Sequence, residues 1–252
     1  MYKEHPDFKT PDDKTPIWRY LNFSKLVSLL EYSSLFFPSV LKLAEDDPYE
    51  GSYARGNIDY DPMGDPVLKA AGPQVIASIQ KMREESRKFV KEKCRKIFYV
   101  NSWYINEHDS AAMWKCYAEH EDGIAIQSTV GKLKEAVKDF SEEIYISRIS
   151  YIDYETSIIS EGDLFSNFLC KRKSFEHERE LRAVLANFKL VESDTILPGG
   201  VAVPVDVKTL IEKILISPTA SSWVKDLVET IAIKYGLGRI VKKSSLREGG
   251  LW

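Results

Sequence analysis

The stretch "KRKSFEHERELRAV", Lys171–Val184, joins a cationic run, three glutamates and an apolar tail. Glu176, Glu178 and Glu180 follow one another at intervals of two residues, and side chains at this spacing project from one face of a β-strand. We therefore predict a strand over residues 178–188 and expect all three carboxylates to project together.

Three carboxylates on one face repel each other unless cations or solvent lie between them. Arg179 would point away from that face, so neutralisation has to come from the preceding helix end or from a ligand. One interpretation is an exposed, charged strand face with surface ion pairs of small net value. The alternative is a carboxylate offered to a hydroxylated or cationic substrate. The cations close in sequence are Lys171, Arg172, Lys173, Arg179 and Arg182.

Hydrophobic periodicity outward from this stretch predicts alternating strands and helices. Strands are expected at residues 17–23, 34–40, 97–104, 123–129, 142–154, 199–207, 212–218 and 239–246. Helices are expected at residues 24–33 with Ser24 as N-cap, 73–96, 110–120, 130–140, 163–175 and 221–237, the last ending at Gly236 or Gly238. The pattern indicates one α+β domain over residues 1–252, with a loose lead at 1–16 and an inserted helical segment at 65–96.

The composition is that of a folded chain, with 44% hydrophobic and 29% charged residues. A net charge of −3 gives no global attraction to nucleic acid, so any such binding has to use local runs. These runs are "KCRK" at 93–96, "KRK" at 171–173 and "VKK" at 241–243.

The three cysteines lie far apart and no histidine stands at metal spacing, so we predict no metal site and a reducing compartment. The N-terminus lacks an apolar signal segment, and no apolar run approaches the ~18 residues of a membrane span. We expect a cytoplasmic protein that does not contact a membrane. The phosphate-loop, dinucleotide-fold, zinc-protease and hydrolase motifs are absent from the sequence.

Arg19 lies among Trp18, Tyr20 and Phe23 on a predicted strand. It is either an edge arginine whose stem covers apolar surface or an arginine that binds a carboxylate or phosphate through its planar fork.

A second polar cluster, Asn101–Tyr104, ends a predicted strand and leads into the loop "INEHD". The aromatic stripe after it, Met113, Trp114 and Tyr117, is typical of core. His108 has no nucleophile partner at a recognised spacing and is expected to be a loop or capping residue.

The sequence resembles a bacterial family known as domain of unknown function 2971 (DUF2971). The resemblance rests on the segment from "WRYLNFSKLV" to "DDPYEG", on "NSWYINEHDSAAMWKCYAEHEDGIAI", on "FLCKRKSFEHERELR" and on the late "ILISP". These segments lie between about Trp18 and about Ser245.

The order of elements more distantly resembles the ADP-ribosyltransferase superfamily and its DarT-like and RES-like bacterial relatives. Those proteins carry Arg or His on the first strand, Ser or Tyr on a middle strand and a catalytic Glu near the end. The resemblance implies a mostly antiparallel central sheet flanked by helices and NAD as co-substrate. Arg19, Tyr20, Ser102, Trp103 and Tyr104 would then bind NAD, and Glu178, Glu176 or Glu180 would be catalytic. No glutamate pair of the arginine-modifying type is aligned, and the inserted helical segment has no counterpart.

Breaking the bond to nicotinamide passes through an oxocarbenium-like state, as in glycoside hydrolysis. A carboxylate near the ribose stabilises that charge, and Glu178 is the first candidate, with a second glutamate orienting the acceptor. The resemblance thus implies an ADP-ribosyltransferase or NAD glycohydrolase, as in bacterial toxins or phage defence, with a protein or nucleic-acid acceptor. Two alternatives remain: an effector that acts on nucleic acid or binds a nucleotide, and a noncatalytic sensor or interaction module.

Overall fold

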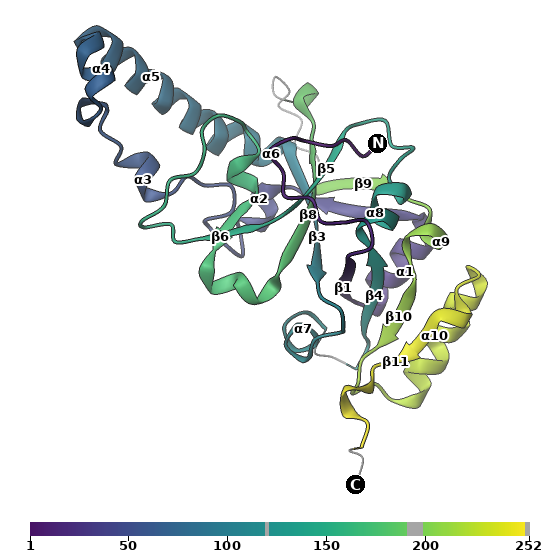
Figure 1. The fold of residues 1–252 in the computed structure, drawn as a ribbon. Coiled ribbons are helices and arrows are strands. Elements are labelled where there is room, and N and C mark those ends of the chain that lie inside the picture. Colours follow the sequence, from purple (N-terminus) through teal and green to yellow (C-terminus); the bar gives the residue numbers. More distant parts are fainter. Residues whose placement is uncertain (119–120, 191–198, 250–252) are drawn as a thin grey trace.

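The central element of the fold is a seven-stranded sheet of order β11-β10-β4-β1-β3-β8-β5 (Figure 1). The computed structural model describes residues 1–118, 121–190 and 199–249. Neighbouring strands of the sheet are antiparallel except β10 and β11, which are parallel. The structure therefore confirms the predicted α+β class with a mixed, mostly antiparallel sheet flanked by helices. The strands are β1 (Pro16–Asn22), β3 (Phe98–Ile105), β4 (Gly123–Thr129), β5 (Ile144–Arg148), β8 (Glu180–Ala186), β10 (Lys213–Ile216) and β11 (Val241–Lys243).

The two faces of the sheet bury different side chains because successive residues of a strand point to opposite faces. On β8, Leu181 and Leu185 enter the larger core, whereas Val184 packs with Phe168 and Val100 in a second core. The larger core also takes side chains from α1 (Phe23–Tyr32), α8 (Val130–Ala136), α9 (Val207–Leu210) and α10 (Ser222–Lys234). The second core takes side chains from α2 (Val40–Leu43) and from residues 90–97.

Strand β1 is paired unequally with its two neighbours. It pairs with β4 along all seven of its residues, but with β3 only through Ile17–Ile105 and Trp18–Tyr104. Beyond Trp18 the ladder to β3 stops, and the Arg19 guanidinium donates to the main-chain oxygen of Ser102 on β3. This local separation places a cationic group beside β3.

Shorter elements complete the frame. β2 (Ser34–Pro38) pairs antiparallel with β9 (Gly200–Pro204), and β6 (Ser150–Ile152) pairs parallel with β7 (Cys170–Arg172). α7 (Ala111–Tyr117) follows β3 and buries Met113 and Trp114 in a third, smaller core. The N-terminal lead runs beside β5, with the amide of Lys3 donating to the Ile144 carbonyl oxygen at 2.9 Å.

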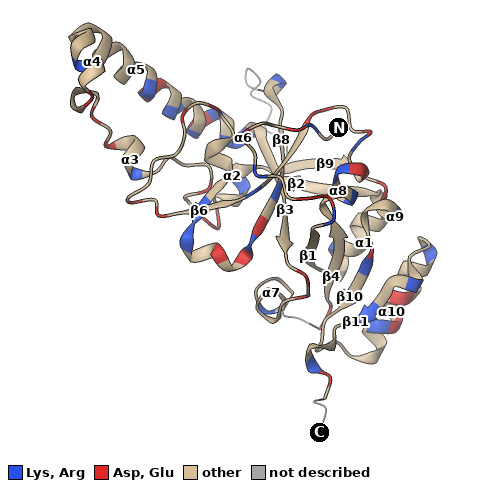
Figure 2. Cartoon of the chain, viewed as in Figure 1, with Lys and Arg blue, Asp and Glu red and all other residues tan. Residues whose placement is uncertain are grey.

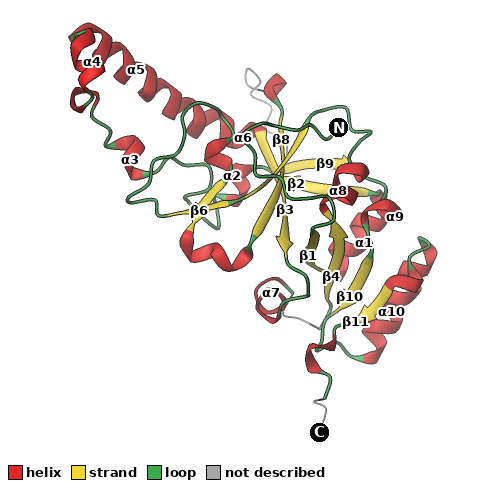
Figure 3. Ribbon diagram, in the orientation of Figure 1, coloured by secondary structure: helices red, strands yellow, loops and turns green. Residues whose placement is uncertain are grey.

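The inserted segment forms a helical arm that extends away from the sheet (Figures 1 and 3). Gly72, at φ +95°, separates α4 from α5 and adopts a conformation that other residues rarely take. A π-helical turn, Val90–Cys94, continues α5 and is followed by α6, which leads into β3. The arm carries charges of both signs (Figure 2), and Ile76 is the one buried residue of α5. The predicted segment 65–96 contains α4 (Pro66–Ala71), α5 (Pro73–Phe89) and the start of α6 (Arg95–Ile97), and α3 (Arg55–Ile58) and η1 (Pro62–Gly64) precede it.

Several predicted boundaries were wrong. Residues 163–175 form no α-helix: they contain the 3₁₀ turn η3 (Ser166–Phe168) and β7. The strand expected at 142–154 is divided into β5 and β6, and the N-cap of α1 is Asn22 rather than Ser24. Gly236, at φ +78°, follows the end of α10 as predicted. The end of the predicted 110–120 helix, residues 119–120, lies outside the described residues.

The prediction for the stretch Lys171–Val184 was also wrong. Lys173–Glu178 is a 3₁₀ helix, η4, and β8 begins at Glu180. Arg179 between them has φ +38°, an uncommon left-handed conformation for a residue with a side chain. The three glutamates therefore do not share a strand face. Glu176 is exposed, whereas Glu178 and Glu180 are buried.

Candidate active site

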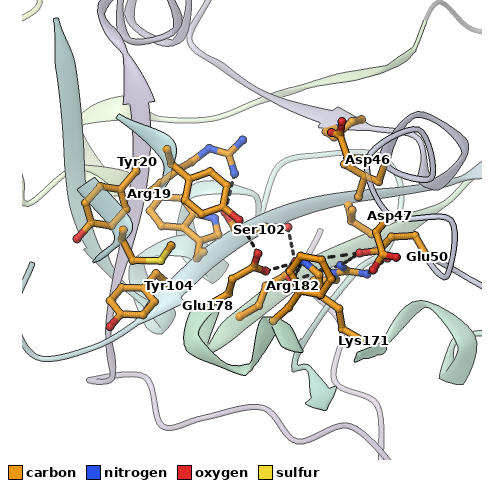
Figure 4. Close-up of a pocket in the computed structure, with 18 of the residues that line it drawn as sticks. Arg19, Tyr20, Asp46, Asp47, Glu50, Ser102, Tyr104, Lys171, Glu178 and Arg182 are labelled. Atoms are coloured by element: carbon orange, nitrogen blue, oxygen red, sulfur yellow. Dashed lines mark hydrogen bonds and ion pairs between the residues drawn. The ribbon is translucent and has the colours of Figure 1, made fainter. Parts of the chain in front are cut away.

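A cavity of about 540 Å³ lies where β1, β3, β8 and η4 meet. Arg19 and Tyr20 line it from β1, Ser102 and Tyr104 from β3, and Glu178 and Glu180 from η4 and β8 (Figure 4). The fold therefore brings residues of all three polar clusters to one site, including two of the three glutamates. The volume falls in the range of about 300–1,000 Å³ that small-molecule sites commonly have.

Arg19 supplies a cation to the cavity. Its Nη1 donates to the main-chain oxygen of Ser102 at 2.7 Å, the one hydrogen bond that its guanidinium makes with the described residues. Burial lowers the pKa of Arg19 to about 10, although the charge of Glu180 acts in the opposite direction. The guanidinium thus stays protonated at neutral pH and keeps donors available for an anionic group.

Glu180 is a buried carboxylate whose acceptor sites are filled. Its Oε1 accepts from Ser102 Oγ at 2.5 Å and from Arg182 Nε at 2.6 Å. Its Oε2 accepts from Arg182 Nη2 at 3.2 Å and from Lys171 Nζ at 3.4 Å. Burial acts to raise the pKa of Glu180, but Arg182, Lys171 and the hydrogen bonds outweigh it and lower the pKa to about 2. A carboxylate offers roughly four lone-pair positions, and here four donors occupy them.

Arg182 is the centre of the network. The side chain is 1% exposed, and besides Glu180 it contacts the Glu50 carboxylate at 2.9 Å and 2.6 Å and the Phe168 carbonyl oxygen at 2.9 Å. Burial opposes its charge, but the Glu180 and Glu50 carboxylates raise the pKa of Arg182 well above its ordinary value. A buried guanidinium with all its donors used is a rigid support for the carboxylates it holds.

Glu178 differs from Glu180 in its free acceptor capacity. Its Oε1 accepts from the Tyr117 hydroxyl at 2.5 Å, and its Oε2 accepts from Lys171 Nζ. With one donor on each oxygen among the described residues, two lone-pair positions remain for a ligand. Burial and the contact with Glu178 raise the pKa of Tyr117, so the phenol stays protonated and donates. Of the two glutamates next to Ser102 and Tyr117, Glu178 is thus the one with acceptor positions left for a bound hydroxyl.

Aromatic rings form part of the wall. The rings of Tyr20 and Trp114 meet edge to face with centroids 5.2 Å apart, and those of Tyr20 and Tyr104 are 6.3 Å apart. The Tyr20 hydroxyl accepts from the Ser110 amide at 2.7 Å, which fixes the ring. Trp103 also lines the cavity, although most of the ring packs in the larger core and its indole N–H is donated to Asn101 Oδ1 at 2.8 Å. Rings of this kind suit a flat heteroaromatic group.

Sequence reasoning missed Glu50 and underrated Tyr117. Glu50 lies in a loop without hydrophobic periodicity, so nothing local relates it to Arg182, 132 residues later. Tyr117 belongs to the stripe expected in the core, but it is 50% exposed, whereas Met113 and Trp114 are buried as expected. The phenol hydroxyl of Tyr117, which needs a hydrogen-bond partner where the ring is buried, was the signal available.

Glu176 lines a different groove, together with His177 and Arg179. His108 lies in the loop before α7, where its carbonyl oxygen accepts from the Asn106 side chain at 2.8 Å.

Each basic run places at least one cation in an internal contact. Arg172 of "KRK" binds Asp47 at 2.8 Å, Arg95 of "KCRK" donates to loop carbonyl oxygens, and Lys243 of "VKK" donates to the Ala220 carbonyl oxygen at 2.7 Å. These runs are therefore less available to phosphates than the sequence alone indicates.

Within residues 1–118, 121–190 and 199–249, no group of three or more His, Cys, Asp or Glu side chains is arranged to hold a metal ion. Across the same ranges, no helix has the length and apolar character needed to cross a bilayer.

Two solved structures are similar to the chain over most of its length. The structure of Thermus sp. 2.9 DarT in complex with ADP-ribosylated ssDNA has 12% identity and a TM-score of 0.38, covering 94% of this chain and 96% of that one. The structure of the same DarT in complex with carba-NAD+ has 12% identity and a TM-score of 0.39, covering 93% and 96%. No protein-family model and no curated protein sequence matches the chain, so membership of the DUF2971 family stays a prediction. With likeness this distant, the function has to be inferred from the chain's own residues.

Proposed function

We propose that this protein consumes NAD, as an ADP-ribosyltransferase or an NAD glycohydrolase. One observation carries the proposal: Arg19 and Glu178, far apart in sequence and on different elements, face the same cavity. The cavity thereby offers a fixed cation and a carboxylate with open acceptor positions to one ligand. A dinucleotide whose anionic pyrophosphate is joined to a cationic, hydroxylated half matches this pairing.

In the proposed reaction the glycosidic bond between the ribose C1′ and the nicotinamide nitrogen breaks. The bonding electrons leave with nicotinamide, and positive charge develops on the ribose as an oxocarbenium-like state. Glu178 accepts a hydrogen bond from a ribose hydroxyl and stabilises that charge, because a buried carboxylate beside the ribose acts strongly on it. Arg19 binds the pyrophosphate, and Tyr20 and Tyr104 contact the bases or nicotinamide.

The nucleophile decides which of the two activities results. Water attacking C1′ gives ADP-ribose and a released proton, which is NAD hydrolysis. A hydroxyl, amine or base nitrogen of a protein or nucleic acid gives a covalent ADP-ribosyl adduct, with its proton passing to solvent. Glu180, whose acceptor sites are occupied by Ser102, Arg182 and Lys171, holds the site in shape and is not the carboxylate that reacts.

The test compares Glu178→Gln with Glu176→Gln in purified protein incubated with NAD, with nicotinamide release as the measurement. Glu176 is a matched control because it belongs to the same turn but is exposed and lies outside the cavity. We expect E178Q to lose about 100-fold or more in rate, as when one key electrostatic group of an active site is removed, and E176Q to match the unmodified protein. Equal rates in both variants, or no NAD binding and no nicotinamide release by the unmodified protein, would overturn the proposal.

A further inference from the structure

The polar network of the cavity continues out of it, into the root of the helical arm. Glu50, which holds Arg182 through both carboxylate oxygens, belongs to the loop between α2 and α3. The main chain of that loop is held by Arg95, the first residue of α6. Arg95 Nε donates to the Glu50 carbonyl oxygen at 2.9 Å, and its Nη2 donates to the carbonyl oxygens of Glu50 at 2.5 Å and Pro48 at 2.9 Å.

The position of Arg95 in its helix suits this task. It directly follows the π-helical turn Val90–Cys94, which ends the long arm helix. An extra residue in a helical turn changes the direction of the side chains that follow, and such turns are frequent at functional sites. Val90 and Cys94 are buried against the second core, so the turn is fixed to the body of the protein. Arg95 therefore links a rigid point of the core to the loop that carries Glu50.

The same loop is also held on either side of Glu50: Asn167 Nδ2 donates to the Ser52 carbonyl oxygen at 3.0 Å, and the Tyr49 and Tyr154 rings meet with centroids 5.0 Å apart. Arg172 binds the Asp47 carboxylate at 2.8 Å and lies over the Tyr49 ring at 4.8 Å. Those contacts fix residues 47–49, whereas the carbonyl group of Glu50 itself is held by Arg95. The Glu50 carboxylate in turn fixes the Arg182 guanidinium, and Arg182 fixes the Glu180 carboxylate.

We propose that Arg95 is a positioning residue, which through Glu50 and Arg182 fixes the carboxylates of the cavity. The proposal rests on the proposed function, since Glu178 is placed relative to Glu180 by the Lys171 ammonium that contacts both. The helical arm then contributes to the geometry of the active site, because Arg95, at the start of its last helix, fixes the loop that carries Glu50.

The kinetic test uses Arg95→Met, with Lys96→Met as the control. Lys96 is the neighbouring residue and is exposed, so the control removes the same charge without touching the loop. We expect R95M to slow NAD consumption about 10- to 100-fold, since small displacements of catalytic groups cost about this much, while its Kd for NAD stays within about threefold. K96M should match the unmodified protein.

A double-mutant cycle tests whether Arg95 acts through Glu50 or destabilises the protein independently of it. If Arg95 acts through Glu50, the variant carrying both Glu50→Gln and Arg95→Met loses no more than the worse single variant. Losses that multiply would show that the two residues act independently and would overturn the proposal. An R95M rate equal to that of K96M would do so as well.

A second readout does not depend on turnover. Nuclear magnetic resonance measures how fast the Arg182 Nε proton exchanges with water, and this proton is buried against Glu180. We expect exchange to quicken at least tenfold in R95M and to be unchanged in K96M. If the unmodified protein consumes no NAD, the proposed function fails, and the exchange rates alone decide whether Arg95 positions the network. Unchanged exchange in R95M would overturn the positioning role.

Discussion

At the scale of single residues, the two buried glutamates show how neighbours divide roles between chemically identical groups. Glu180 meets four donors and is strongly acidic, whereas Glu178 meets two and keeps acceptor capacity for a ligand. The difference follows from Arg182, which lies on the same strand two residues from Glu180 and therefore on the same face.

Arg19 gives a prediction at this scale. Arg19→Lys keeps a positive charge and a donor for the Ser102 carbonyl oxygen, but removes the planar fork that binds phosphate through two N–H groups. We expect NAD binding to weaken about 10- to 100-fold, the range for losing one charge-assisted hydrogen bond, with a smaller change in the rate of bound substrate. Calorimetric titration with NAD measures this. Arg179→Lys serves as the control because Arg179 is exposed. If R19K and R179K bound NAD with the same affinity, Arg19 would not be the residue that binds the pyrophosphate.

Part of the site could be predicted from residues alone. Residue patterns indicated the polar clusters around Arg19, Ser102 and Glu178, and the resemblance to ADP-ribosyltransferases assigned them site roles; the three residues line one cavity. Glu50 could not be selected in this way. Its partner Arg182 is fixed by the tertiary fold, and the acidic loop around Glu50 has no periodicity that predicts which carboxylate turns inward.

At the scale of elements, the stretch around Arg179 explains why the strand prediction failed. Alternation in "EHERELRAV" is compatible with a strand from residue 176 onward, but η4 occupies Lys173–Glu178 and Arg179 takes φ +38°. This left-handed residue ends the 3₁₀ helix, and β8 begins directly after it. Glu178 and Glu180 consequently reach the cavity from different elements, which periodicity along one strand could not reveal.

The loop that presents Glu50 depends on one glycine. Gly51 has φ +65°, and a Cβ atom there would lie 2.6 Å from Cε1 of the Phe168 ring. Phe168 is buried in the second core and cannot move away. Gly51→Ala is expected to strain the backbone and to push the loop from the core, which displaces the Glu50 side chain from Arg182.

The expected cost of G51A is about 1–3 kcal/mol in the free energy of unfolding, combining a disfavoured backbone with overpacking. Urea unfolding measures this loss. Gly64→Ala is a suitable control because no atom lies within 4 Å of a Cβ added there and its φ is not positive. A G51A protein as stable as G64A would show that the loop adapts without strain.

At the scale of the whole molecule, the sheet holds together segments that no local pattern relates. Strand β1 lies beside β3, and β3 lies beside β8, so residues 19, 102 and 180 become neighbours across three strands. The class of the fold follows from alternating strand and helix patterns, which is why it was predictable. The inserted arm was recognised as helical, but its connection to the site through Arg95 depends on tertiary contacts.

The charge network also sets how the whole molecule responds to acid. The pKa of Glu180 is about 2 in the folded protein against an ordinary value of 4.5, because Arg182 and Lys171 outweigh the effect of burial. A carboxylate whose folded pKa is lowered stabilises the fold above its unfolded pKa, and this contribution is lost as the pH falls through the folded value. The stabilisation is therefore complete above about pH 4.5 and disappears by about pH 2.

The difference between these pKa values corresponds to about 3–4 kcal/mol, at roughly 1.4 kcal/mol for each pH unit. Glu180→Gln removes this contribution and leaves Arg182 short of a partner, so at pH 7 the variant is expected to be less stable than the unmodified protein. The difference in the free energy of unfolding between E180Q and the unmodified protein should narrow as the pH is lowered from 4.5 toward 2, because the unmodified protein alone loses the contribution of this carboxylate.

Urea unfolding at several pH values measures this difference. Glu176→Gln, which replaces an exposed carboxylate in the preceding turn, should differ from the unmodified protein by almost nothing. A difference for E180Q that stays constant over this range would mean that Glu180 is not held as an ion by Arg182 and Lys171, and the division of roles between the two buried glutamates would lose its basis.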